Sequence, residues 1–153
     1  MVDQLSGGRL EIGFGRGSSA TGVSFYGQDP AKAQELYTEA RALIVQGLTH
    51  KILDFEGTFF NFKEIPMELE PLQKPHPPMW YGVHSVEAAD RAARQDLNMV
   101  SLDSSKDTRS YNDRYRQVWR RSDGEQAVPK LGLSRFIVIA ENGTEALRVA
   151  RRA

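Results

Sequence analysis

The sequence predicts an α/β fold with a parallel sheet, and two observations carry that prediction. Short apolar runs with the period of a strand alternate with segments of helical period, and this alternation occurs four times. Each segment between successive strands is long enough for a crossover helix, which is the usual connection between parallel strands. Four such units fit a doubly wound domain of 153 residues, or half of an eight-unit barrel.

The first strand–helix unit is predicted from residues 10–15 and 30–48. Leu10, Ile12 and Phe14 alternate with polar residues or glycine, which is typical of a strand. A loop of small residues follows. Asp29 and Pro30 then form a helix start, because Asp is a favoured N-cap and Pro is favoured at the first helical position. The apolar residues that follow recur at helical spacing up to residue 48.

A non-helical excursion is expected between the first and second units. Aromatic residues on both sides of Glu56 and Gly57 predict a short hairpin over residues 52–62. Residues 66–78 carry five of the seven prolines, so this stretch must be extended or turning. It is interpreted either as a linker or as a segment that its aromatic neighbours anchor to the main body.

The remaining units follow in close succession. A buried strand over residues 79–83 ends at His84, and a helix with a face of alanines begins at Ser85. The later expected strands cover residues 98–102 and 132–140, the expected helices cover residues 107–121 and 144–152, and a turn is expected at Asn142-Gly143.

Composition excludes several classes of protein. Lys+Arg and Asp+Glu both number 20, and this balance argues against a protein of nucleic acid or anionic membranes. The absence of cysteine excludes disulfides, thiolate metal sites and thiol nucleophiles. The three histidines do not have metal-binding spacing, so no metal site is expected. No apolar run reaches membrane-spanning length and no signal peptide is recognised, so a cytoplasmic protein is expected.

The loop that follows the first strand is a candidate anion site. Its glycines let backbone N–H groups approach a ligand closely, and the guanidinium of Arg16 suits a phosphate. The glycine spacing matches neither a Walker loop nor a dinucleotide fingerprint. The alternative is a flexible turn with Arg16 in a surface ion pair.

The start of the helix after the second strand is another candidate. Ser85 can cap this helix, and the first-turn N–H groups of a helix can bind an anion. Taken alone, an N-cap without a ligand is the simpler interpretation. The two features together favour a ligand site, because ligands gather at the carboxyl ends of parallel strands.

The sequence resembles the bacterial luciferase-like flavin monooxygenases. The resemblance lies in four segments: residues 3–9 leading into Gly13–Gly17, residues 25–29, residues 57–60, and residues 71–80 followed by a strand, Ser85 and a helix. It implies an eight-unit (β/α) TIM barrel that binds reduced FMN or, in a sister branch, F420. Residues 1–153 resemble the region of strands four to seven, so we expect a single domain, truncated at both ends relative to the family: a partial barrel with a short β excursion.

The resemblance also implies cofactor-binding residues. Arg16 matches an arginine that reaches the flavin phosphate, and Gly17 and Ser18 supply neighbouring backbone groups. Ser85 matches a serine that binds the same phosphate. The family's acid/base histidine precedes the region matched here, so the catalytic residues stay unknown.

The implied function is oxidation of a small organic substrate by reduced flavin and O2. The alternatives are a non-catalytic flavin-binding or partner module, and an unrelated nucleotide-binding α/β domain. Half a barrel would leave two sheet edges open, and open edges recruit further strands. A homo-oligomer or association with a complementary chain is therefore expected.

Overall fold

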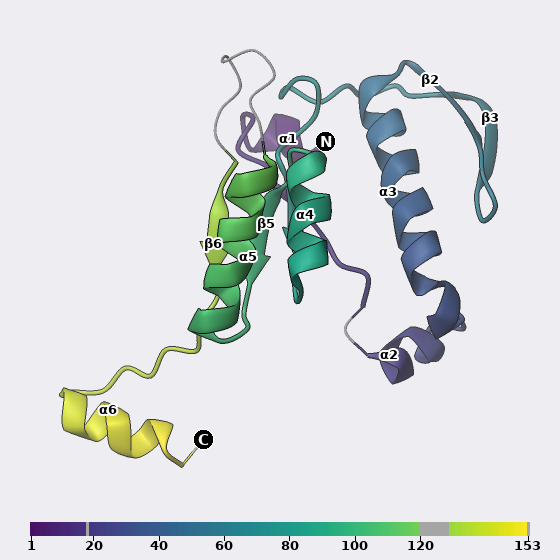
Figure 1. The fold of residues 1–153 in the computed structure, drawn as a ribbon. Coiled ribbons are helices and arrows are strands. Elements are labelled where there is room, and N and C mark those ends of the chain that lie inside the picture. Colours follow the sequence, from purple (N-terminus) through teal and green to yellow (C-terminus); the bar gives the residue numbers. More distant parts are fainter. Residues whose placement is uncertain (18, 120–128, 153) are drawn as a thin grey trace.

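The computed structural model describes residues 1–17, 19–119 and 129–152. Its main sheet has four parallel strands in the order β1-β4-β5-β6, of which β5 and β6 are labelled in Figure 1. Their bounds are β1 Ile12–Phe14, β4 Met79–Gly82, β5 Asn98–Ser101 and β6 Leu131–Leu133. The predicted α/β fold with a parallel sheet is thus confirmed.

Helices connect the strands of this sheet. Helix α3 (Ala33–Thr49) follows β1, α4 (Val86–Arg94) follows β4, and α5 (Ser105–Val118) follows β5. Helix α6 (Gly143–Ala150) follows β6 and lies apart from the sheet (Figure 1). No helix in the described parts of the chain has both the length and the apolar character needed to cross a membrane.

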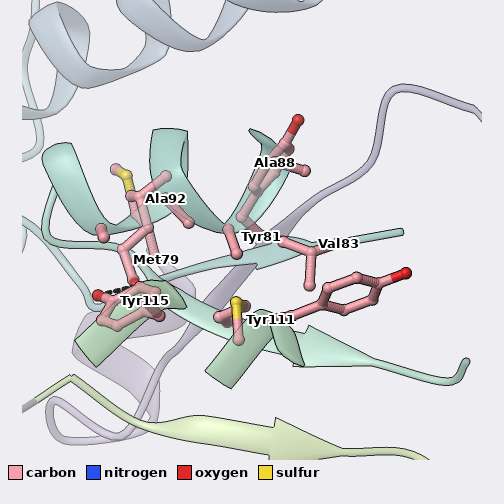
Figure 2. Close-up of a cluster of buried hydrophobic side chains, with 11 residues drawn as sticks. Met79, Tyr81, Val83, Ala88, Ala92, Tyr111 and Tyr115 are labelled. Atoms are coloured by element: carbon pink, nitrogen blue, oxygen red, sulfur yellow. Dashed lines mark hydrogen bonds between the residues drawn. The ribbon is translucent and has the colours of Figure 1, made fainter. Parts of the chain in front are cut away.

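The core lies where α4 and α5 pack against β4 and β5 (Figure 2). The side of α4 that faces the strands consists of alanines, whose small side chains let the helix approach the sheet closely. The Tyr115 hydroxyl is buried in this core and donates a 2.7 Å hydrogen bond to the Leu97 carbonyl. The buried members of the cluster are Met79, Tyr81, Val83, Ala88, Ala89, Ala92, Ala93, Leu97, Met99, Tyr111 and Tyr115.

The predicted hairpin is confirmed as a separate antiparallel pair of strands. Strands β2 (Ile52–Glu56) and β3 (Asn61–Pro66) flank a turn that is attached to α3. The Glu39 carboxylate accepts hydrogen bonds from the backbone N–H groups of residues 58, 59 and 60, at 2.9, 2.7 and 2.7 Å. A Cβ at Gly57 would overlap that carboxylate, so a side chain at this position would displace Glu39 from the turn.

The proline-rich segment is anchored to the main body. Asp3, in the short helix α1 (Val2–Leu5), accepts hydrogen bonds from the backbone N–H and the side-chain amide of Gln73, at 3.1 and 2.9 Å. The same amide donates to the Leu10 carbonyl at 2.7 Å. These bonds support anchoring, rather than a free linker, for residues 66–78.

The predicted strand over residues 132–140 is wrong in extent. Strand β6 covers only Leu131–Leu133, and Phe136 and Ile139 are almost fully exposed. The physical reason is pairing: β5 ends at Ser101, whose carbonyl accepts the last hydrogen bond, 2.9 Å long, from Ser134. Beyond that point, the described residues offer the apolar run no neighbouring strand.

Other differences lie at element ends. Helix α2 (Ala20–Phe25) forms in a stretch for which no element was predicted, and Ser19 caps it by accepting from the Gly22 N–H at 3.0 Å. The predicted helix over 30–48 begins as a 3-10 turn, η1 (Pro30–Lys32), before α3. The predicted helix over 107–121 begins two residues earlier, and its last two predicted residues lie outside the described part of the chain.

Candidate functional site

A cavity of about 550 Å³ lies at the carboxyl ends of β1 and β4. Three of the four predicted cofactor-binding residues, Arg16, Gly17 and Ser85, line this cavity together. The fourth, Ser18, lies outside the described residues. The two candidate anion sites of the sequence are therefore parts of a single site.

The loop after β1 presents Arg16 to the cavity. Arg16 is exposed, and within the described parts of the chain no carboxylate lies within ion-pair distance of it. Gly17 has a φ of +94°, a conformation that residues with a Cβ rarely adopt, and a Cβ there would lie 3.1 Å from Val23 Cγ2. The loop thus depends on glycine for its shape and leaves its guanidinium available to a ligand.

Ser85 begins helix α4 at the opposite wall. Its Oγ accepts a hydrogen bond from the Ala88 N–H at 3.1 Å, which is the predicted N-cap. The pKa of Glu87 in the first turn is lowered, first by its own backbone N–H and then by the Ser85 hydroxyl. This helix start therefore favours negative charge, as expected of first-turn N–H groups and the helix dipole.

Arg91 and Gln34 also line the cavity, and reasoning from the sequence did not identify Arg91 as a site residue. Arg91 lies on α4, six residues after Ser85, and helical side chains lean toward the helix N-terminus. The position of Arg91 six residues after Ser85 could have predicted a second positive charge at the cavity. Within the described residues, Arg91 has no ion-pair partner.

His84 adds a titratable group to the same cavity. Its Nδ1 lies 2.9 Å from Asp103 Oδ1, and Tyr111 donates its hydroxyl to Asp103 Oδ2 at 3.2 Å. The hydrogen bond from His84 is the main cause of the lowered pKa of Asp103. The residues that line the cavity include two arginines and a histidine but no carboxylate, so the arrangement suits an anionic ligand.

The charged side chains that line this cavity are cationic. In the described residues, no group of three or more histidine and carboxylate side chains is placed to hold a metal ion. The ligand that the geometry favours is instead a phosphate, because guanidinium forks and helix N–H groups both bind it well.

A family model for luciferase-like monooxygenases matches residues 1–153. The chain belongs to the luciferase-like monooxygenase family. This match excludes the alternative of an unrelated nucleotide-binding domain. It also confirms the resemblance noted from the sequence.

Two curated relatives show how much of such a protein this luciferase-like chain covers. It is 32% identical to the uncharacterized protein y4wF of Sinorhizobium fredii over 154 residues, which are 100% of the chain and 45% of the relative. It is 26% identical to the FMNH(2)-dependent dimethylsulfone monooxygenase of Pseudomonas putida, over 97% of the chain and 41% of that protein. The chain thus spans less than half the length of these relatives.

Solved structures give the same picture of the fold. The monooxygenase RslO1 of Streptomyces bottropensis matches with a TM-score of 0.78 and 22% identity, over 99% of this chain and 47% of that one. The oxygenating constituent of 3,6-diketocamphane monooxygenase of Pseudomonas putida, in complex with FMN, matches with a TM-score of 0.73 and 17% identity. The match covers 99% of this chain and 46% of that one. An F420-dependent secondary alcohol dehydrogenase matches with a TM-score of 0.70 and 15% identity, over 98% of this chain and 46% of that one. The fold is therefore part of a luciferase-like barrel.

Proposed function

We propose that this chain provides the phosphate-binding part of the flavin site of a flavin-dependent monooxygenase. The observation that carries the proposal is the cavity at the ends of β1 and β4, which Arg16 and Arg91 line from two walls without any carboxylate. FMN is the proposed cofactor, since a relative is FMNH(2)-dependent and a structural neighbour holds FMN. F420 is the alternative, supported by the F420-dependent neighbour.

Each residue has a distinct part in holding the phosphate. Arg16 offers a planar fork that can donate two hydrogen bonds to one phosphate. Gly17 lets the loop backbone come close, and Ser18 is proposed as a further backbone donor. Ser85, the N-cap of α4, lines the cavity at the positive end of that helix, and Arg91 adds the second positive charge.

Reduced flavin, when bound, would supply electrons to O2 and so activate it to oxidise a small organic substrate. The residues of this chain would anchor the cofactor by its phosphate and so place the rest of it at the carboxyl ends of the strands. The anchor holds the cofactor in position and leaves the chemistry to groups elsewhere in the site. The substrate stays unassigned.

A non-catalytic flavin-binding or partner module is the second candidate function. It is favoured by the cavity residues named above, which can hold an anion but include no group assigned to the oxidation. The sheet of the described residues ends at β1 on one side and β6 on the other, so both edges are open to further strands. We propose association with a second copy or with a complementary chain. Cytoplasmic location stays a prediction.

The test is a comparison of FMN with riboflavin, which lacks the phosphate. Hydrogen bonds to charged groups contribute about 1.5–3 kcal/mol each, and they must offset the entropy of association. We expect micromolar or weaker affinity for FMN, much weaker binding of riboflavin, and loss of most of the difference in Arg16→Ala. Arg116→Ala is the matched control, because Arg116 pairs with Asp113 on the exposed face of α5.

Two outcomes would contradict the proposal. Equal affinity for FMN and riboflavin would show that the phosphate is not recognised. Unchanged FMN affinity in Arg16→Ala would show that Arg16 does not bind the phosphate. The loop after β1 would then be interpreted as a turn without a binding role. F420 measured in the same way decides between the two cofactors, because the tighter ligand is the better match to the cavity.

A further inference from the structure

The side chain of His84 is held in one orientation by residues from two other segments. Its Nδ1 lies 2.9 Å from Oδ1 of Asp103, which follows β5, and Oδ2 of Asp103 accepts from Tyr111 of α5 at 3.2 Å. The Asp103 side chain is 24% exposed and the His84 side chain is 59% exposed. The imidazole is therefore fixed on one edge and accessible on the other.

The partner of Nδ1 determines what the other ring nitrogen can do. An ionised carboxylate only accepts hydrogen bonds, so Nδ1 of His84 carries the hydrogen in this pair. The Nε2 atom then carries a hydrogen only when the ring is protonated. His84 can therefore donate to a ligand in the cavity only as an imidazolium.

We propose that His84 is a further ligand of the anion in this cavity, donating from Nε2 to the flavin phosphate while Asp103 holds the ring from Nδ1. The inference rests on the proposed function and extends it to a residue of the same cavity. Phosphate affinity should then fall as the imidazole loses its proton with rising pH. Histidine is the side chain that ordinarily titrates near neutral pH.

The charges around His84 decide whether its protonated form is tolerated beside two arginines. Asp103 is in direct contact and its pKa is lowered, first by the bond from His84, so the carboxylate opposes the repulsion. The other groups that face this cluster are Glu87 and Arg91 of α4, Asp107 and Tyr111 of α5, Arg135 after β6, and Arg16 of the loop after β1.

The experiment measures the dissociation constants of FMN and riboflavin at about pH 6.5, the usual midpoint of histidine titration, and at about pH 8.5, well above it. The proteins are the wild-type chain, His84→Gln and Asp103→Asn. Since phosphate monoesters themselves gain charge near pH 6, the His84→Gln variant supplies the background. Wild type should lose about three- to tenfold more FMN affinity than His84→Gln over this range, the size expected of an exposed charged donor.

Asp103→Asn separates orientation from charge. The amide oxygen that this substitution introduces can still accept from Nδ1 of His84, but the negative charge that stabilises the imidazolium is gone. We expect this variant to bind FMN more weakly than wild type at about pH 6.5 and equally at about pH 8.5. Identical affinities of wild type and Asp103→Asn at the lower pH would overturn the role of Asp103.

The outcomes distinguish this inference from the proposed function. If Arg16→Ala loses its preference for FMN while His84→Gln keeps the wild-type pH dependence, the inference fails and the proposed function stands. If wild type shows no preference for FMN at either pH, the proposed function fails. The second readout is then the imidazole nitrogen NMR titration of His84 with inorganic phosphate against chloride at equal ionic strength. A titration that phosphate shifts supports His84 as an anion ligand, and one that it leaves unchanged overturns it.

Discussion

Replacing Gly17 by alanine should weaken FMN binding without unfolding the protein. Gly17 has a φ of +94°, and a Cβ there would lie 3.1 Å from Val23 Cγ2. A residue with a side chain in such a conformation costs about 1–3 kcal/mol. The exposed loop can escape this strain by changing shape, and it then no longer presents Arg16 in the same way. At 1.4 kcal/mol for each factor of ten, we expect FMN affinity to fall about tenfold.

The assay is a fluorescence titration with FMN and riboflavin, together with thermal denaturation. Gly7→Ala is the matched control, because Gly7 also has a positive φ, +64°, but does not line the cavity. The expected loss falls on FMN and not on riboflavin, and the melting temperature stays close to that of wild type. The reasoning is refuted if Gly17→Ala binds FMN as wild type does, or if Gly7→Ala weakens binding equally.

Three predictions concern stability. Tyr115→Phe removes a 2.7 Å hydrogen bond inside the core and should lower the unfolding free energy by about 1–2 kcal/mol; an unchanged melting temperature would contradict this. Gly57→Ala should displace the Glu39 carboxylate and speed amide exchange in the turn between β2 and β3, while the main sheet keeps its protection. Slow exchange in the turn of this variant would show that the hydrogen bonds to Glu39 do not hold the turn in place. Burial of Asp3 raises its pKa, but hydrogen bonds from Gln73 outweigh this and leave the pKa lowered. The stability this adds is present above the ordinary carboxyl range and lost as pH falls through the lowered pKa, so Asp3→Asn should reduce acid sensitivity in melts from pH 5 downward, and an unaltered profile would exclude it.

The periodicity of the sequence was sufficient to predict the order of the main-sheet strands and of the helices that follow them, but it predicted neither helix α2 nor the ends of the elements. Strand β4 and helix α4 lie where the alternation of apolar residues and the alanine spacing place them, because both patterns report burial against the same core. The apolar run from Phe136 to Ile139 has the composition of a strand and is exposed outside any strand. Strand length is set by the partner, and β5 stops at Ser101.

The candidate site was only partly predictable for a similar reason. Arg16 and Ser85 stand next to strand ends, where local sequence shows both the position and the chemistry. The contact of His84 with Asp103 joins residues that are 19 apart, through the parallel pairing of β4 with β5. No local pattern contains such a contact, and it becomes visible only when the register of the two strands is known.

The strand order has a consequence for how the chain acquires its structure. Strand β5 pairs with β4 and β6 pairs with β5, so each new strand adds beside the one that precedes it in the main sheet. The N-terminal part of a polypeptide leaves the ribosome first and begins to fold while the remainder is still being made. In this topology every emerging strand finds its neighbour already in place, but the first pairing joins Ile12 of β1 to Met79 of β4, and such non-local parallel pairing is slow to form. Assembly can therefore follow translation one strand–helix unit at a time, with the β2–β3 hairpin forming on its own in the interval between β1 and β4.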